Sequence, residues 1–88
     1  MLVHKQITIK GKVENTGFRF HALRGAYVYS INGFVSQKGG NIVIEAEGEP
    51  GAMDHFTEWC RQGTTFSHIS GVEVINKEIY GYQNFQIH

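Results

Sequence analysis

The stretch from Gly11 to Arg19 contains the residue types in this sequence that could do chemistry. It reads Gly-Lys-Val-Glu-Asn-Thr-Gly-Phe-Arg, so an alternating apolar segment runs into a turn of small residues and then directly into a helical pattern. Unpaired N–H groups at a helix start bind anions, and the N–H groups of a curled loop add to such a site. Arg19 falls in the first expected helical turn, where the helix dipole favours negative charge, so a bound anion would compensate it. The spacing therefore predicts an anion site, with a plain turn and a solvated arginine as the alternative.

Hydrophobic periodicity predicts the elements that must position this loop. Residues 3–13 alternate between apolar and polar side chains, which indicates a half-buried strand ending in the loop. Residues 18–31 carry an apolar stripe at helical spacing that includes Tyr27, and Gly25 within it indicates close packing. The remaining expected elements are strands over 33–37, 42–47, 71–80 and 85–87 and a helix over 50–63, with a hairpin turn at 38–41.

The order of these elements is β-α-β-β-α-β with a short extra strand at the end. This order is typical of an α+β sandwich of the ferredoxin-like type, in which two helices cover one face of an antiparallel sheet of four to five strands. The 88 residues allow a single domain over 1–88, and 41% hydrophobic residues suffice for one small core.

Composition excludes several classes of function. Eight Lys and Arg residues balance eight Asp and Glu residues, which argues against nucleic-acid binding. The single cysteine, Cys60, allows no internal disulfide or zinc-binding cysteine pair, and its place on an apolar stripe predicts a buried thiol. The chain shows neither an apolar run long enough to span a membrane nor a signal-peptide core, so we expect a soluble, cytoplasmic protein.

Several short motifs, in order along the chain, resemble those of the acylphosphatase family. The first family signature, approximately G-x-V-Q-G-V-x-F-R, is matched by Gly11, Val13, Phe18 and Arg19. The second, approximately G-W-V-x-N followed by a hairpin and V-x-x-x-A-E-G, is matched by Gly33-Phe34-Val35 and Ala46-Glu47-Gly48. The family's F-x-x-W-x-x-x-G and terminal F-x-I are matched by Phe56, Trp59, Gly63, Phe85 and Ile87. The resemblance covers nearly the whole chain and implies the same β-α-β-β-α-β fold.

This resemblance implies hydrolysis of a small-molecule acyl phosphate to a carboxylate and phosphate, without a metal or other cofactor. In the family, loop amides and an arginine hold the phosphoryl group, and an Asn amide on the neighbouring strand orients the attacking water. The arginine corresponds to Arg19, whose guanidinium offers fork-shaped donors suited to phosphate. The resemblance implies phosphate binding along the loop by Glu14, Asn15, Thr16, Gly17, Phe18 and Arg19.

Two parts of the expected site differ from the family pattern. Counting from Gly33 places Gln37 where the family has its water-orienting Asn, and a displacement of about 1 Å can cost on the order of 100-fold in rate. In the loop, Glu14 replaces Gln, and a carboxylate 4 Å from a phosphate would repel it by about 4 kcal/mol at an effective dielectric of 20. Asn15 replaces Gly but tolerates a left-handed backbone, and Thr16 could add a hydroxyl donor.

These differences leave two functional hypotheses. The first is an acylphosphatase with reduced turnover, in which Arg19 and Gln37 are the catalytic residues. The second is a non-catalytic ferredoxin-like module whose loop still binds an anion. For either we expect a monomer with no nucleic-acid or membrane partner.

The remaining polar and aromatic residues favour structural interpretations. The five histidines lack metal-ligand spacing and are expected to be solvated or capping, although His21 could add a donor near the loop. The acidic side chains of Glu45, Glu47 and Glu49 alternate along one strand face and its exit, which predicts a solvated face. Tyr80, Tyr82 and Phe85 lack the interleaved basic residues of an RNA-binding sheet, and no cysteine pair indicates copper binding.

Overall fold

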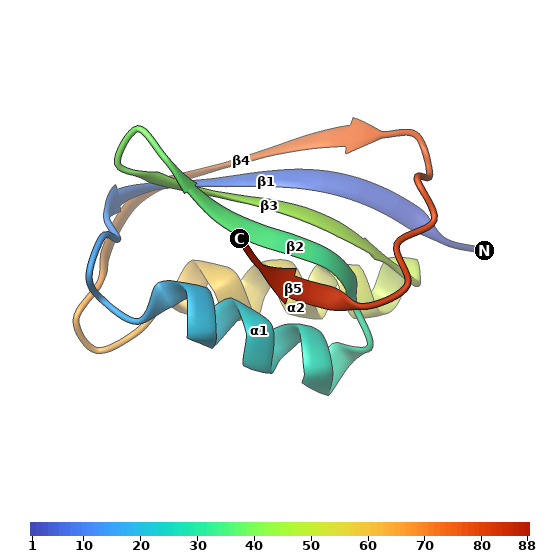
Figure 1. Ribbon diagram of the computed structural model, residues 1–88, viewed down its shortest axis with the longest axis horizontal. Helices are drawn as coiled ribbons and strands as arrows, with labels where there is room; N and C mark the ends of the chain where they lie inside the picture. The colour runs from blue at the N-terminus through green and yellow to red at the C-terminus, as the bar shows by residue number, and fades with distance from the viewer.

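Five strands form one mixed sheet, and two helices cover one of its faces while the other face stays open (Figure 1). The computed structural model describes residues 1–88. Its elements are β1 (Val3–Lys12), α1 (Phe18–Tyr29), β2 (Asn32–Lys38), β3 (Asn41–Gly48), α2 (Pro50–Gln62), β4 (His68–Lys77) and β5 (Phe85–Ile87). The predicted ferredoxin-like order of elements is therefore confirmed.

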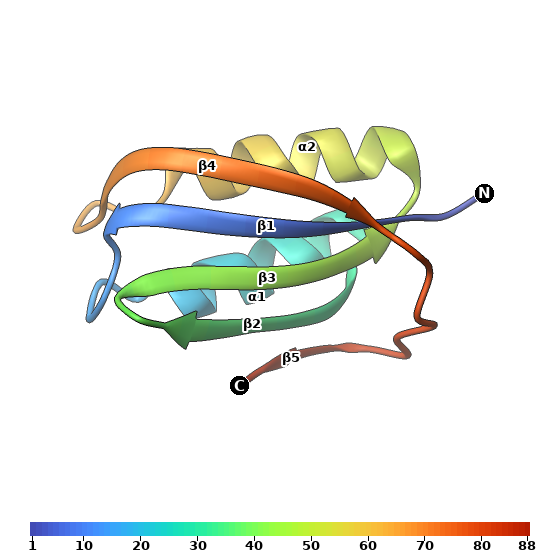
Figure 2. The ribbon, with the colours of Figure 1, turned by 90° about the horizontal axis from the view of Figure 1, so that it is seen from above.

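The strands lie in the order β4-β1-β3-β2-β5 (Figure 2). β1 pairs antiparallel with both β3 and β4, and β2 pairs antiparallel with β3. The short last strand was expected at an edge, and it pairs there with β2, but in parallel. The sheet is mixed for this reason, because residues 78–84 cross one end of the sheet before β5 begins at the opposite edge (Figure 2).

The hydrophobic core fills the space between the sheet and the helices. Alternate residues of the two central strands point into it, among them Ile7 and Ile9 on β1 and Ile42 and Ile44 on β3. The expected burial of Cys60 on α2 is confirmed, and burial raises the pKa of its thiol far above the ordinary range. This thiol is therefore a small buried hydrophobe without nucleophilic character.

Helix α1 is shorter than the predicted helix over 18–31, and the face that it buries differs from the predicted apolar stripe. It ends at Tyr29, because Ser30 adopts a left-handed backbone, φ 55°, and the Ile31 N–H closes the helix on the Ala26 carbonyl at 2.8 Å. Tyr27, which was expected on the buried stripe, is 89% exposed. The stripe that faces the core consists of Phe18, Ala22, Gly25 and Ala26.

The predicted close packing at Gly25 is confirmed. A Cβ atom at this position would lie 2.4 Å from Cδ1 of Trp59 on α2, which is closer than any real contact. Gly11 in β1 has an equally strict requirement, because its φ is 127° and a Cβ would lie 2.1 Å from the His68 carbonyl oxygen of β4. The irregular pairing of β1 with β4 between Lys10 and Gly11 falls at this close approach.

Strand β4 begins and ends three residues earlier than the predicted strand over 71–80. At its start, His68 and Ile69 pair with the last residues of β1, so the strand begins before the apolar pattern does. At its end, residues 78–82 leave the sheet edge because polar side chains on the open face hold their backbone.

The carboxylate of Glu47 on β3 makes this attachment, which we call the carboxylate clamp. It accepts hydrogen bonds from the backbone N–H groups of Tyr80, Gly81 and Tyr82, the last two at 3.1 and 2.9 Å to Oε1. The prediction of a solvated face is wrong here, since Glu47 is only 3% exposed and Glu45 is also buried. Only Glu49, beyond the strand, is exposed as expected.

His4 completes the clamp and contradicts the expectation of a solvated or capping histidine. It is buried on β1, with Nε2 2.8 Å from Glu45 Oε1 and Nδ1 2.7 Å from the Glu78 carbonyl oxygen. Both ring nitrogens therefore face oxygen atoms. Nδ1 also lies 3.4 Å from Glu47 Oε2, so the ring sits between two carboxylates.

The clamp changes the ionisation of Glu47. Burial by itself would raise the pKa of this carboxyl group. The three N–H donors of residues 80–82 and the nearby His4 outweigh burial, so the pKa of Glu47 lies below its usual range. Burial and the neighbouring Glu45 and Glu47 carboxylates raise the pKa of Tyr82 in the same region.

Candidate active site

The loop between β1 and α1 curls tightly before the helix begins. Asn15 has a φ of 57° and Gly17, the residue that caps α1, has a φ of 76°. Both values lie in the left-handed region, so the expectation that Asn15 would tolerate this conformation is confirmed. Two left-handed residues within three positions turn the backbone of the loop around a concave surface.

The backbone N–H groups of this loop are free to bind a ligand. The first helical hydrogen bond runs from the His21 N–H to the Gly17 carbonyl at 3.1 Å, and none of the N–H groups from Glu14 to Phe20 bonds to another backbone group. No acidic side chain lies in the first turn of α1 and no side chain caps it. Unpaired N–H groups and the positive end of the helix dipole therefore meet at one place, an arrangement that favours an anion.

Two threonine hydroxyls stabilise the loop by donating hydrogen bonds to its carbonyl oxygens. The Thr16 hydroxyl donates to the Val13 carbonyl at 2.7 Å, so this hydroxyl stabilises the curl and does not point outward as a donor. The Thr64 hydroxyl, which follows α2, donates to the Thr16 carbonyl at 2.9 Å. Sequence reasoning missed Thr64, because nothing in its spacing connects it with a loop 48 residues earlier.

A pocket of about 140 Å³ opens on the concave side of the loop, and we call it the phosphate pocket. Arg19 from α1 and Gln37 from β2 both line it, together with Val13, Asn15, Gly17, Phe18, Phe20 and Ile42. Gln37 reaches it because it pairs with the buried Ile42 on β3 and so lies near the end of the sheet. Five of the seven predicted site residues therefore meet in one pocket: Asn15, Gly17, Phe18, Arg19 and Gln37.

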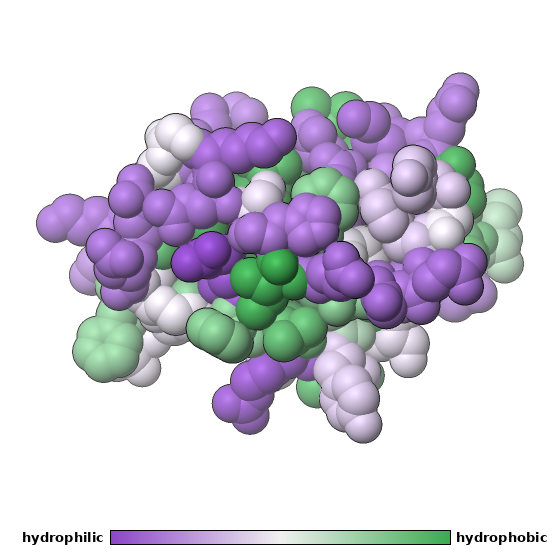
Figure 3. All heavy atoms as spheres, viewed as in Figure 1, coloured by the Kyte–Doolittle hydropathy of each residue, from purple (hydrophilic) through white to green (hydrophobic).

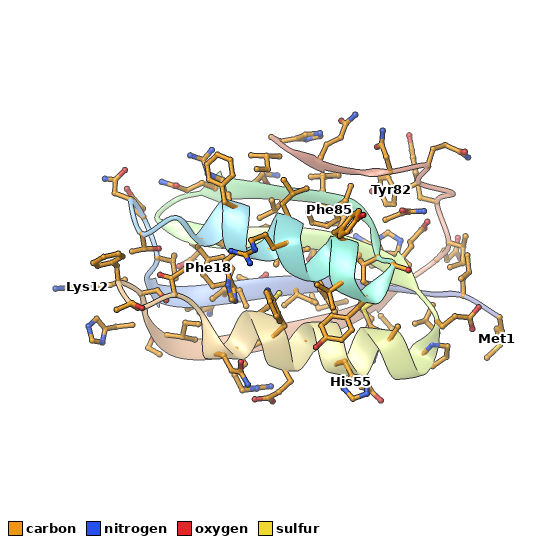
Figure 4. All side chains as sticks on the ribbon, turned by 90° about the horizontal axis from the view of Figure 1, so that it is seen from below. Met1, Lys12, Phe18, His55, Tyr82 and Phe85 are labelled. Atoms are coloured by element: carbon orange, nitrogen blue, oxygen red, sulfur yellow. The ribbon has the colours of Figure 1, made fainter.

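The contributions of Arg19 and Phe18 differ in kind. Arg19 is exposed, and its Nη1 donates to the His88 carbonyl oxygen at 3.4 Å, which keeps the guanidinium near the end of β5. The Phe18 side chain packs between α1 and the sheet and is almost fully buried (Figure 4). Phe18 therefore offers the pocket its backbone N–H, whereas Arg19 also offers its side chain.

Glu14 and Thr16 do not line this pocket. They line a neighbouring, wider cavity of about 640 Å³ with Gly39, Gly40, Asn41, Phe66 and residues 11–13 and 15. The Glu14 carboxylate lies against the β2–β3 hairpin, since a Cβ on Gly40 would be 3.0 Å from Glu14 Oε1. Asn41, the asparagine beyond the turn of this hairpin, lines the same wider cavity and not the phosphate pocket.

His21 does not line the phosphate pocket, so the structure does not support the alternative in which it adds a donor there. Its ring stacks on that of Trp59 with centroids 4.9 Å apart, and its Nε2 lies 2.8 Å from the Trp59 carbonyl oxygen. In return, Trp59 Nε1 donates to the His21 carbonyl at 2.7 Å. This reciprocal pair joins α1 to α2 and keeps the first turns of α1 in place.

No group of three or more His, Cys, Asp or Glu side chains is arranged to hold a metal ion. Neither helix combines the length and the apolar character needed to cross a bilayer. The polar side chains that line the phosphate pocket are the Arg19 guanidinium and the amides of Asn15 and Gln37.

Comparison with known proteins gives a consistent result. The profile of the family described as Acylphosphatase matches residues 5–87. An acylphosphatase from Geotalea uraniireducens is 32% identical over 99% of this chain and 98% of its own length. Acylphosphatase-1 from Drosophila melanogaster is 34% identical over 93% of this chain and 72% of its own length. The crystal structure of acylphosphatase from Bacillus subtilis matches with a TM-score of 0.95 at 29% identity, covering all of this chain and 99% of that one.

Proposed function

Because the chain belongs to the acylphosphatase family, we propose that it hydrolyses the carboxyl-phosphate bond of small-molecule acyl phosphates, giving a carboxylate and phosphate. The observation that carries this proposal is the single pocket in which unpaired loop N–H groups, Arg19 and Gln37 meet. Each of these groups supplies something that the reaction needs, and none of them requires a metal ion.

The loop amides and Arg19 hold the phosphoryl group. Phosphoryl transfer demands accurate positioning and stabilisation of charge more than covalent chemistry by the protein. The N–H groups of residues 14–19 and the guanidinium donate to the phosphoryl oxygens, whose negative charge the N-terminus of α1 also favours. The carboxylate product is a good leaving group, so the reaction does not need a strong general acid.

Gln37 orients the attacking water. Its side-chain amide can accept a hydrogen bond from the water and donate one to the phosphoryl group, as an Asn amide does. The additional methylene places the amide roughly 1.5 Å further from the backbone. We therefore expect turnover that depends on Gln37 but is lower than an asparagine would support.

The orientation of Glu14 makes the loop compatible with phosphate. Its carboxylate lies beside Gly40, on the hairpin side of the loop, and not in the phosphate pocket. The backbone N–H groups of Glu14 and Thr16 remain unpaired and belong to the same curled loop. The two side chains then act on the loop itself. The loop residues that line the pocket are Asn15, Gly17, Phe18 and Arg19.

Hydrolysis of benzoyl phosphate in the presence of EDTA tests the proposal, with Arg19→Ala and Gln37→Asn measured beside the native chain. We expect metal-independent turnover that Arg19→Ala reduces at least 100-fold and that Gln37→Asn increases. Full activity in Arg19→Ala would contradict the assignment of this site.

The second candidate is an anion-binding module without turnover, and the observation that favours it is the Gln side chain at position 37. It predicts that inorganic phosphate binds in calorimetry while acyl phosphates stay intact. A gain of turnover in Gln37→Asn, from none in the native chain, would mean that the module keeps an intact phosphate cradle. Turnover in the native chain that is lost with Arg19 excludes this candidate.

A further inference from the structure

The phosphate pocket is too small to enclose an acyl phosphate that carries a ring. Its volume is about 140 Å³, and a water molecule takes roughly 30 Å³ in the liquid. The pocket thus has room for a phosphoryl group and an attacking water but not for an additional ring. A bulky acyl group must therefore extend out of the pocket over its rim.

The apolar residues of the pocket are unequally accessible. Val13, Phe18 and Ile42 are at most 2% exposed, so they form a floor that belongs to the core. Phe20 is 67% exposed and lines the same pocket. It is therefore the one apolar side chain of the pocket that offers its surface to an acyl group.

Exposure alone does not single out Phe20. Tyr27 and Val28 on the same helix are 89% and 58% exposed, and single apolar side chains on a surface are ordinary. Figure 3 shows one face of the molecule, which is mostly polar and has several apolar groups side by side near its centre. What distinguishes Phe20 is its location, because neither Tyr27 nor Val28 lines the phosphate pocket.

Phe20 lines the pocket together with the groups that would hold the phosphate. It follows Arg19 in the first turn of α1, the turn whose N–H groups have no backbone partner. A phosphoryl group held by Arg19 and these N–H groups would have its acyl oxygen within reach of the adjacent rim. The rest of the rim is polar, with Asn15, Gly17 and Gln37.

We infer that Phe20 is a specificity-determining residue that makes the pocket prefer acyl phosphates with an aromatic acyl group. This inference rests on the proposed function and adds the class of acyl group to it. An aromatic acyl group can stack on the Phe20 ring or meet it edge to face, and it buries apolar surface of both partners. A small acyl group such as acetyl gains little from the ring, because it scarcely extends past the rim.

The test compares kcat/KM for benzoyl phosphate and acetyl phosphate in the native chain, Phe20→Ala and Tyr27→Ala. The native chain should prefer benzoyl phosphate, and Phe20→Ala should lose roughly five- to tenfold in kcat/KM for it. The same variant should change kcat/KM for acetyl phosphate less than twofold. Tyr27→Ala is the matched control, since it removes an exposed aromatic ring from the same helix, and it should keep the native preference.

Equal relative losses of kcat/KM for the two substrates in Phe20→Ala would leave the native preference unchanged. This result would overturn the role of Phe20 while leaving the proposed function intact. Absence of turnover for both substrates in the native chain would instead contradict the proposed function. A binding measurement separates the two failures further, using benzoylphosphonate and acetylphosphonate, in which the acyl carbon is bonded directly to phosphorus and the bridging oxygen is absent. In calorimetry the native chain should bind benzoylphosphonate more tightly, and equal Kd values for it in the native chain and Phe20→Ala would overturn the inference.

Discussion

Two segments of this molecule curl their backbone so that successive N–H groups point to one place, and they differ in what occupies that place. At the carboxylate clamp, residues 80–82 surround the side chain of Glu47 from the same chain. At the loop over 14–19, the N–H groups have no partner within the protein and a pocket opens in front of them. Both curls contain left-handed residues, Gly81 in the clamp and Asn15 and Gly17 in the loop.

The comparison shows how one backbone device serves two purposes. A row of N–H groups favours negative charge wherever it occurs. When the chain supplies the anion, as Glu47 does, the device contributes to folding and the site is closed to solvent. When the chain supplies none, the same device leaves a place for an anion from solution. Arg19 adds a positive charge at the open site, and the His4 ring lies 3.4 Å from the carboxylate at the closed one.

The largest effect on stability should come from removing the negative charge of Glu47 at the closed site. Glu47→Gln keeps the shape of the side chain but removes the charge, and its amide N–H₂ faces backbone donors. We expect a loss of about 3 kcal/mol in the free energy of unfolding, measured in urea. Glu49→Gln is the matched control because Glu49 is exposed, and it should change stability by less than about 0.5 kcal/mol. Equal effects in the two variants would show that the clamp does not stabilise the fold.

Acid should weaken the clamp in the native chain gradually, and the loss of stability should be smaller than that caused by Glu47→Gln. The folded pKa of Glu47 lies below its ordinary value of 4.5, so the clamp contributes fully above that pH. Its contribution is lost as the pH falls below 4.5 and through the folded pKa, where the carboxylate takes up a proton. Urea unfolding between pH 7 and 3 should therefore show a steeper loss of stability for the native chain than for Glu47→Gln. Parallel pH profiles of the two proteins would contradict the lowered pKa.

Filling the open site should stabilise the molecule, as Glu47 does at the closed one. Inorganic phosphate at ten times its Kd should raise the free energy of unfolding by about 1.4 kcal/mol, seen as a higher Tm. Arg19→Ala should abolish most of this increase, whereas Tyr27→Ala should retain it. A phosphate-dependent Tm in Arg19→Ala equal to that of the native chain would place the anion elsewhere.

The smallest effect is expected at Glu14, in spite of its place within the loop. Its carboxylate lies against Gly40 and outside the phosphate pocket. Glu14→Gln should therefore change kcat/KM for benzoyl phosphate less than about threefold, since an exposed charge at a distance is largely screened. An increase of 100-fold or more would mean that the carboxylate repels the substrate directly.

The fold and the loop could be predicted because the signals that encode them are local. Alternation in β1 and β3 gave the buried Ile7, Ile9, Ile42 and Ile44 correctly. The left-handed conformation of Asn15 follows from its own side chain and its place in a turn. Gln37 was assigned only through the resemblance to the family, by counting from Gly33, and its pairing with Ile42 brings it to the pocket.

The errors share a physical cause, which is that burial depends on segments distant in the sequence. Glu47 occupies the face that alternation assigns to solvent, but residues 80–82 cross over it more than 30 positions later. His4 is covered by the same crossing, and its partners Glu45 and Glu78 lie 41 and 74 positions away. The alternative that His21 adds a donor at the loop, raised by its spacing to Arg19, fails for the same reason, because Trp59 on α2 holds its ring.

The order of the strands also has a consequence for how the chain acquires its fold during synthesis. Both outer strands of the sheet, β4 and β5, come from the last twenty-one residues of this sequence, 68–88. Until these residues leave the ribosome, β1 and β2 are the edges of a three-stranded sheet and expose unpaired backbone groups. Such edges readily pair with those of another chain. The crossing segment held by Glu47 therefore ends a period in which the nascent chain is open to aggregation, because it brings the final strand to the second edge.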